Sequence, residues 1–204
     1  MFIQTLSNAI FQLVLFSIVP FFWWIFTARK KENLFAWIGL IRPAFHSKMQ
    51  TLFISFVTLA VLTAVGLFLI FSFYDKSLLA NAIFADAGAA GIAPVLIYAI
   101  LQTGLSEEIF FRGFLGKRLS QKFGFVTGNS IQAILFGLVH GVLLYGNVGM
   151  VRVIAVTAFT GIVGWLMGYL NERLGNGSII PSWIIHSLMN IISSSIFLFG
   201  IITV

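Results

Sequence analysis

AIFQLVLFSIVPFFWWIF, the run from Ala9 to Phe26, decides the class of fold because it contains no charged side chain. A helix needs roughly 20 apolar residues to cross a bilayer core, and this run is close to that length. No positively charged segment precedes it, and Arg29, Lys30 and Lys31 follow it at once. This order argues against a cleaved secretory signal and indicates a retained first helix whose N-terminus lies outside.

The composition extends this interpretation to the whole chain. Hydrophobic residues make up 59% of the 204 residues, charged residues only 9%, and the mean hydropathy is +1.03. A chain of this length has room for about six membrane spans and little else. We therefore predict an all-α, polytopic transmembrane helix bundle that forms one membrane domain overall. We expect N-terminal helices with a basic segment in residues 1–90 and a core in residues 91–204.

Further apolar runs predict the other spans. We expect helices over about residues 51–73, 94–117, 126–144 and 153–170, and a last helix from Pro181 towards the C-terminus. The segment RKKENLFAWIGLIRPAFHSK, residues 29–48, is too short to cross the membrane, so we expect it to lie along the membrane surface. We interpret His46 within it as a loop residue. In the fifth helix, glycines at 161, 164 and 168 are spaced to let another helix approach closely.

Basic residues are distributed unevenly among the predicted loops. Those expected on the cytoplasmic side are Arg29, Lys30, Lys31, Arg42, Lys48, Lys117, Arg118, Lys122 and Arg173. Lys76 and Arg152 are expected outside. Because lysine and arginine collect in cytoplasmic loops, this asymmetry supports an outward N-terminus. The net charge of +6 thus indicates orientation in a membrane, in our interpretation a prokaryotic inner membrane, and not nucleic-acid binding.

The stretch GLSEEIFFRGF, from Gly104 to Phe114, places three ionisable side chains in an otherwise apolar run. A charge buried in lipid costs roughly 3 kcal/mol or more, so these side chains must face protein, water or one another. Glu108 and Arg112 are four residues apart with the acid first, which favours an ion pair on one helical face. Glu107 lies about 100° around the helix from Glu108 and has no obvious partner on its own helix.

Two later spans carry polar side chains that could meet Glu107. His140 ends the motif FGLVH, while His186 and Asn190 begin and end HSLMN, one helical turn apart on one face. With some helix tilt, their depths allow a shared site near the midplane. Structural interpretations remain open as well, since the ion pair can be purely structural and the other side chains can hydrogen-bond across a helix interface. The three clusters together favour a functional site.

These motifs resemble those of a known family. EEIFFR, FGLVH and HSLMN match EExxxR, FxxxH and HxxxN, in the order found in the CAAX protease and bacteriocin-processing (CPBP or Abi) family of intramembrane proteases. The resemblance covers about residues 92–192, including the glycine-bearing helix and the stretch ERLGNGSIIPSWIIH before the last motif. It implies hydrolysis of a peptide bond within the membrane by an activated water, with a membrane-associated peptide or protein as substrate.

The resemblance also implies a role for each motif residue. Glu107 would be the general base, helped by His140, while His186 and Asn190 would stabilise the oxyanion. These roles agree with the physics of the setting, because a carboxylate in a low-dielectric cavity becomes a better base near neutral pH. Donors fixed in advance act strongly where water is scarce.

By the same resemblance, Glu108 and Arg112 would hold the site in shape. Whether a metal ion takes part in the reaction is a separate question. The chain has no cysteine, but Glu107, His140 and His186 could form a zinc site with an open position for water. Members of the family have been described both as metalloproteases and as glutamate proteases. We expect no metal, because His186 is then free to donate to the oxyanion.

Two other classes of function remain as alternatives. Buried glutamate, histidine and arginine also mark transporters and proton relays, although the chain shows neither inverted repeats nor paired broken helices. A non-catalytic immunity or scaffold protein that binds a membrane peptide is the other alternative. Relatives process prenylated proteins or mature or resist bacteriocin-like peptides, and the sequence does not choose among these substrates. It does not give the oligomeric state either.

Overall fold

The computed structural model describes residues 1–45, 47–73 and 79–201, and within them six helices are long and apolar enough to cross a membrane. The described residues contain no β-strand, so the predicted all-α polytopic bundle is confirmed. The spans are α1 (Phe2–Thr27), α3 (Lys48–Phe73), a composite third span (Gly88–Phe123), α6 (Phe125–Leu144), α7 (Met150–Tyr169) continued by η6 (Leu170–Leu174), and α8 (Ile180–Leu198). The predicted position of His46 lies outside the described residues.

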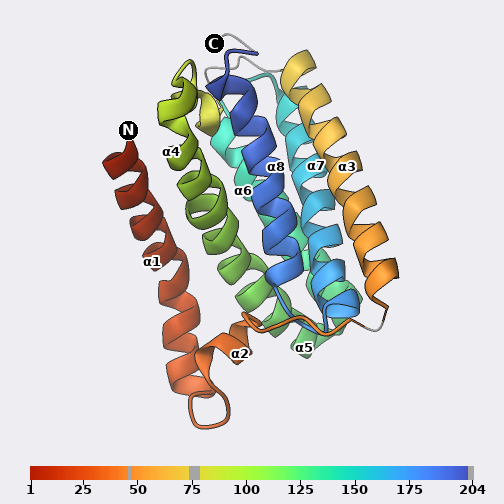
Figure 1. Cartoon of the computed structure of the whole chain (residues 1–204). Coiled ribbons are helices and arrows are strands. Elements are labelled where there is room, and N and C mark those ends of the chain that lie inside the picture. Colours follow the sequence, from red (N-terminus) through yellow and green to blue (C-terminus); the bar gives the residue numbers. More distant parts are fainter. Residues whose placement is uncertain (46, 74–78, 202–204) are drawn as a thin grey trace.

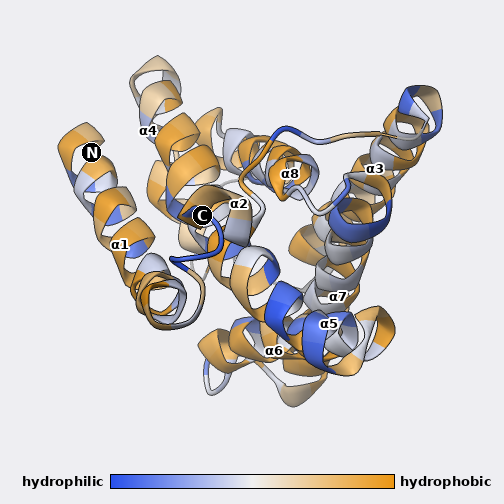
Figure 2. Ribbon diagram, turned by 90° about the horizontal axis from the view of Figure 1, so that it is seen from below, coloured by the Kyte–Doolittle hydropathy of each residue, from blue (hydrophilic) through white to orange (hydrophobic). Residues whose placement is uncertain are grey.

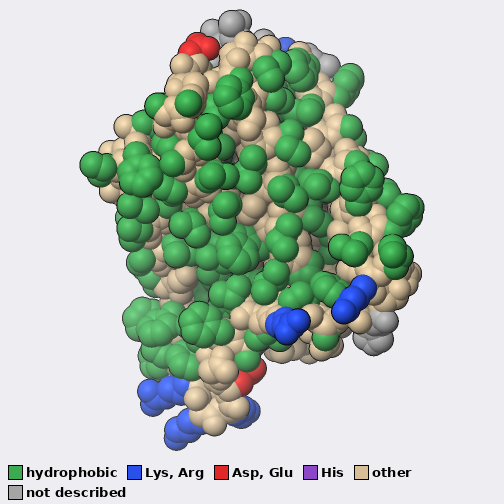
Figure 3. Space-filling view, viewed as in Figure 1, with side chains coloured by type: hydrophobic (Ala, Val, Ile, Leu, Met, Phe, Trp, Pro, Cys, Tyr) green, Lys and Arg blue, Asp and Glu red, His purple; other side chains and the backbone are tan. Residues whose placement is uncertain are grey.

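Successive spans alternate in direction, so the bundle has two distinct ends (Figure 1). α1 begins and α8 ends at one of them, which we call the terminal end. The opposite end carries α2 (Leu34–Ile38) and α5 (Lys117–Phe123). Most described lysine and arginine side chains gather there, so we call it the basic end. Hydrophobic side chains cover the flank between the two ends (Figure 3), as contact with a lipid bilayer requires.

The segment between the first two spans differs from the prediction, because part of it is buried. Asn33 caps α2 by accepting a hydrogen bond from the backbone N–H of Ala36, and Gly39, at φ 78°, ends the helix in the left-handed conformation. Trp37 and Ile38 are 2% and 4% exposed and belong to a hydrophobic cluster beneath the bundle. The sequence could not predict this burial, because an amphipathic segment has the same residue pattern whether it packs against a membrane surface or against protein.

Contacts with two other elements fasten this segment. The carbonyl of Gly39 accepts a hydrogen bond from Ile179 N at 2.8 Å, and Ser178 Oγ donates to the carbonyl of Ile41 at 2.5 Å. The guanidinium of Arg118 lies 4.1 Å from the ring centroid of Trp37. Seen from below, hydrophilic residues concentrate on α5 (Figure 2). The buried apolar side chains of this segment and the charged side chains next to it thus close the basic end of the bundle.

Glycines let α6 and α7 pack at backbone distance. A methyl group placed on Gly137 would lie 2.3 Å from the carbonyl oxygen of Thr157, and one on Gly168 would lie 1.9 Å from Oδ1 of Asn129. A methyl group on Gly164 would lie 3.3 Å from Cα of Ala133. The predicted close helix approach at this glycine-bearing face is therefore confirmed.

The third span departs from regular α-helix around the glutamates. After η3 (Gly88–Gly91) and α4 (Ile92–Ile97) it forms two π-helical stretches, η4 (Tyr98–Leu105) and η5 (Glu108–Gly116). Hydrogen bonds from i to i+5 widen a π-helix, so the expected 100° between neighbouring side chains does not apply here. Glu107 lies between the two stretches, and both it and Glu108 approach the same side chain of α8.

Candidate active site

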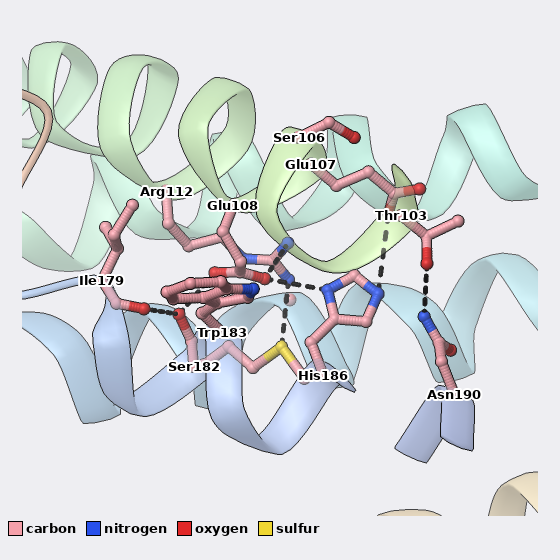
Figure 4. A network of polar contacts seen from close by, with 12 residues as sticks. Thr103, Ser106, Glu107, Glu108, Arg112, Ile179, Ser182, Trp183, His186 and Asn190 are labelled. Atoms are coloured by element: carbon pink, nitrogen blue, oxygen red, sulfur yellow. Dashed lines mark hydrogen bonds and ion pairs between the residues drawn. The ribbon is translucent and has the colours of Figure 1, made fainter. Parts of the chain in front are cut away.

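Glu108 is the most completely paired acid in the described structure. It is 0% exposed, and its Oε1 lies 3.1 Å from Nη1 of Arg112 and 3.0 Å from Nδ1 of His186. Its other oxygen, Oε2, accepts a hydrogen bond from the hydroxyl of Ser182 (Figure 4). The predicted ion pair between Glu108 and Arg112 is therefore present. Both oxygens of Glu108 are engaged, and Glu108 lines neither of the cavities described below.

Arg112 meets soft, polarisable groups on its other sides. Its guanidinium carbon lies 4.1 Å from the ring centroid of Phe136, and Nη2 lies 3.5 Å from the sulfur of Met167. A cation over an aromatic face gains electrostatic attraction even where water is excluded. Arg112 is thus held as a fixed counter-charge to Glu108.

Glu107 differs from its neighbour because one of its oxygens has no hydrogen-bond partner. Its Oε2 is buried without a hydrogen-bond partner among the described residues, and it lies 3.8 Å from Nε2 of His186. That distance is too long for a direct hydrogen bond. It allows a bridging water, which could contact both atoms at normal length. His186 therefore touches Glu108 through one ring nitrogen and approaches Glu107 with the other.

His140 is oriented by its own helix. Its Nδ1 lies 2.8 Å from the carbonyl oxygen of Phe136, and a carbonyl can only accept, so Nδ1 carries the proton. In the neutral ring Nε2 is then an acceptor. The ring of Phe136 packs 4.5 Å from the ring of His140 and 6.3 Å from that of His186, measured between centroids. Phe136, the first residue of the second motif, thus supports both histidines and Arg112.

Asn190 lies one turn beyond His186 on α8. Its amide nitrogen donates to the hydroxyl of Thr103 at 2.8 Å, which ties α8 to the η4 stretch of the third span. An amide nitrogen carries two protons, so a second donor remains available.

A single cavity of about 480 Å³ brings the four predicted catalytic residues together. Its lining includes Tyr98, Gln102, Thr103, Glu107, His140, His186 and Asn190. A second cavity, of about 410 Å³, reaches Glu107 and His140 from the side of α1. Gln12 and Gln102 line both cavities, and the amide nitrogen of Gln12 donates to Ser106 Oγ at 3.2 Å. Amide and hydroxyl side chains therefore surround the unpaired glutamate.

The sequence offered Glu107, His140 and His186 as an alternative set of zinc ligands. No group of three histidine, aspartate or glutamate side chains within the described residues is placed to hold a metal ion. Nδ1 of His140 is bonded to its own helix and Nδ1 of His186 to Glu108. Only the Nε2 atoms of the two rings are left as possible ligands.

Several residues of the site were missed by the motifs alone. Ser182 bonds Glu108, and it also accepts from the amide of Asn171 at 2.6 Å while its backbone N–H donates to Oδ1 of Asn171 at 3.1 Å. A signal was present, because Ser182, His186 and Asn190 recur every four residues and so share one face of α8. For Gln12 the sequence offered a weaker signal, namely an amide side chain within a predicted membrane span.

Comparison with known protein families matches residues 89–192 to the type II CAAX prenyl endopeptidase Rce1-like family. The chain belongs to this family. The match covers more than half of the sequence and contains every motif residue of the site. Comparisons with curated proteins and with solved structures gave no match.

Membership of the Rce1-like family confirms the resemblance drawn from the three motifs. It identifies the chain as a CAAX-protease-like membrane peptidase, and a protease family implies a peptide substrate. The matched residues begin after α3, so α1, α2 and α3 lie outside the Rce1-like match. α1 nevertheless supplies Gln12 to both cavities.

Proposed function

We propose that the protein is an intramembrane endopeptidase that hydrolyses a peptide bond with water activated by Glu107. The observation that carries this proposal is that the two neighbouring acids differ in their hydrogen-bond partners. Glu108 has partners at both oxygens, whereas Oε2 of Glu107 is buried without one and lies 3.8 Å from Nε2 of His186, beside the cavity that both residues line. A base must have a free lone pair within reach of the proton that it takes. Of the two acids, only Glu107 lines a cavity in which a water could be reached.

The proposed reaction proceeds in two steps. Glu107 takes a proton from the bound water as the water oxygen bonds to the carbonyl carbon of the substrate. His140, with Nε2 as an acceptor, takes the second hydrogen bond of that water and orients it. Glu107 then passes the proton to the amide nitrogen as the C–N bond breaks, so that an acid and an amine leave. General acid–base catalysis of this kind contributes about 10²–10⁴-fold to the rate.

His186 and Asn190 stabilise the negative oxygen that forms at the carbonyl. Asn190 has a second amide proton beyond the one given to Thr103. His186 donates through Nε2 only when both ring nitrogens carry a proton, because Nδ1 already donates to the Glu108 carboxylate. Glu108, held by Arg112 and Ser182, fixes the ring that makes this contact. Preorganised donors in a site with little water act strongly on developing charge.

We propose that the reaction uses no metal. If so, EDTA or 1,10-phenanthroline, followed by gel filtration, leaves the cleavage rate of purified protein within about twofold of the untreated rate, far from the 10²-fold or larger loss that removal of an essential catalyst gives. Metal analysis of the active fractions finds less than a stoichiometric amount of zinc. Loss of cleavage on chelation, with recovery on adding zinc, would show that the side chains rearrange around a metal.

We further propose that the basic end faces the cytoplasm of a prokaryotic inner membrane, with the N-terminus outside. The described basic residues support this orientation. Arg29, Lys30, Lys31, Arg42, Lys48, Lys117, Arg118, Lys122 and Arg173 belong to the basic end, whereas Arg152 lies at the terminal end, near the start of α7. Such a bias is the main determinant of orientation in helical membrane proteins.

The substrate class is tested by comparing membrane proteomes. Cells that produce wild-type protein are compared with cells that produce equal amounts of the Glu107→Gln variant. We expect at least one membrane-associated precursor to accumulate in the variant, together with loss of its shorter product. A binding or scaffold function predicts identical proteomes, since the variant keeps the surface and the fold.

A further inference from the structure

α1 forms part of the wall of the candidate active site, although it lies outside the residues matched to the family. It packs beside the third span (Figure 1), where the rings of Phe16 and Phe110 lie 5.5 Å apart between centroids. Its side chains reach both cavities that Glu107 lines. α1 therefore places groups beside the candidate base that the three motifs do not supply.

Side-chain amides mark one face of this helix. α1 has no charged side chain, and its amide side chains are Gln4, Asn8 and Gln12, which recur every four residues. Residues at this spacing share one face of a helix, which we call the amide face of α1. The amide of Gln4 donates to Oδ1 of Asn8 at 3.0 Å, and both Asn8 and Gln12 line the smaller cavity. The amide face thus borders that cavity.

Gln12 and Gln102 hold each other beside Glu107. Nε2 of Gln12 donates to Oγ of Ser106 at 3.2 Å, and Nε2 of Gln102 donates to Oε1 of Gln12 at 3.5 Å. Ser106 directly precedes Glu107 and donates in turn to the backbone carbonyl of Gln102. These contacts tie α1 to the third span at the position of the candidate base and fix both amides there.

Both amides keep hydrogen-bonding capacity beyond these contacts. An amide nitrogen carries two protons, and an amide oxygen accepts two hydrogen bonds. Gln12 uses one proton and one acceptor site in the contacts above, and Gln102 uses one proton. A donor and an acceptor that remain free match the C=O and N–H groups of a peptide bond. The hydrocarbon core supplies no water to such groups, so an extended segment needs partners from protein wherever it passes.

The two cavities meet at these residues and at the candidate catalytic pair. The residues that line both cavities are Gln12, Gln102, Glu107, His140 and Leu143. A peptide bond attacked between Glu107 and His140 lies at this shared boundary, so one flank of an extended substrate lies in the smaller cavity, beside α1. Apart from its amides and the catalytic pair, that cavity has an apolar wall made by Phe11, Leu15, Phe16, Phe111, Val139 and Leu143.

We propose that α1 is a substrate-binding helix, whose amide face and Gln102 bind the main chain of the peptide on one side of the scissile bond. This role rests on the proposed function and deepens it. Gln12 and Gln102 bind a peptide group next to the scissile bond. Asn8 lies one helical turn away, about 6 Å, which an extended chain covers in about two residues. Recognition on this flank therefore depends on main-chain groups and apolar side chains, and not on charge.

Ester bonds in the substrate test this role, because an ester has no N–H and is a weak acceptor. The probes are short synthetic peptides that span the cut site of the precursor accumulating in Glu107→Gln cells, each with one main-chain N–H near the cut replaced by oxygen. We expect an ester at the position that Gln12 contacts to lower kcat/KM of the wild type by about tenfold. The same ester should change kcat/KM of Gln12→Met by less than about twofold, because methionine has no amide to pair with that group.

Two further variants complete the experiment. Gln121→Met is the matched control, because Gln121 is exposed in α5 and lines neither cavity, so it should keep both the wild-type rate and the wild-type ester effect. Asn8→Leu keeps the size of the side chain and suits a membrane helix. It should abolish the effect of an ester placed about two residues further from the cut. Inserted amounts and thermal unfolding in detergent are measured for every variant.

Three results would overturn the binding role of α1. Slow cleavage by Gln12→Met with the tenfold ester effect retained would show that Gln12 acts through Ser106 alone and does not touch the substrate. Ester effects that are the same in wild type, Gln12→Met and Asn8→Leu would show that α1 does not contact the peptide. Esters without effect on the wild type would show that the main chain is not bound on this flank. If Gln12→Met does not insert, Asn8→Leu alone decides.

Failure of the proposed function has a different outcome. If no precursor accumulates in Glu107→Gln cells, the peptidase is refuted and the binding role of α1 with it. A precursor whose cleavage requires Glu107, together with ester effects that do not depend on Gln12 or Asn8, would leave the peptidase standing and refute the role of α1.

Discussion

Replacing Glu107 with glutamine is expected to lower the rate of peptide cleavage by about 10²–10⁴-fold, the usual contribution of a general base. Glutamine keeps the shape of the side chain but has no basic oxygen at neutral pH. Stability is expected to change little, because Oε2 of Glu107 has no hydrogen-bond partner to lose. The variant should therefore be folded and inserted but nearly inactive.

Cleavage is measured with purified protein in proteoliposomes, using the precursor that accumulates in the variant cells. The matched control is Glu32→Gln, which removes an exposed acid at the basic end and should keep the wild-type rate. Thermal unfolding in detergent accompanies both measurements. A Glu107→Gln rate within about threefold of wild type would exclude Glu107 as the base, since even a weak general base contributes about 10²-fold.

Adjacent acids with different partners explain how two glutamates can be tolerated inside the membrane. The charge of Glu108 is compensated by Arg112 and by hydrogen bonds from Ser182 and His186. Glu107 faces a cavity and needs water or substrate to complete its hydrogen bonds. An unpaired carboxylate oxygen beside a cavity is where a reacting group would bind, which supports the proposed role of Glu107 as the base.

The spans and the ion pair could be predicted because they depend on local sequence. Apolar runs give the six helices, and the spacing of Glu108 and Arg112 gives their contact. The predicted meeting of Glu107, His140 and His186 needed only matched depths in a membrane. These features survive small errors in helix bounds, such as a third span that begins at Gly88 and not near Pro94.

Features that depend on packing could not be predicted. The π-helical stretches around Glu107 have no marker in the sequence, yet they bring both acids to the ring of His186. The burial of α2 follows from a partner surface made by Phe114 and Ile179, which lie far away in the sequence. The support that Phe136 gives to two histidines and Arg112 also requires three helices to be placed at once.

Replacing Glu108 with glutamine tests the supporting network through stability. Removal of one partner from a buried ion pair leaves an uncompensated charge and costs about 3–5 kcal/mol. We expect the free energy of unfolding of Glu108→Gln, measured by denaturant titration in mixed micelles, to fall by about that amount. Activity should fall as well, because Nδ1 of His186 loses its carboxylate partner.

A second substitution separates loss of charge balance from loss of packing. Arg112→Met in the Glu108→Gln background removes the stranded cation and places an apolar side chain against Phe136 and Met167, both of which contact Arg112 in the wild type. Replacing a buried ion pair as a unit is often neutral, so most of the lost stability should return. Cleavage should stay low, since no carboxylate then holds His186. A double variant as unstable as the single one would mean that Glu108 acts through Ser182 and His186 alone, with the ion pair contributing nothing.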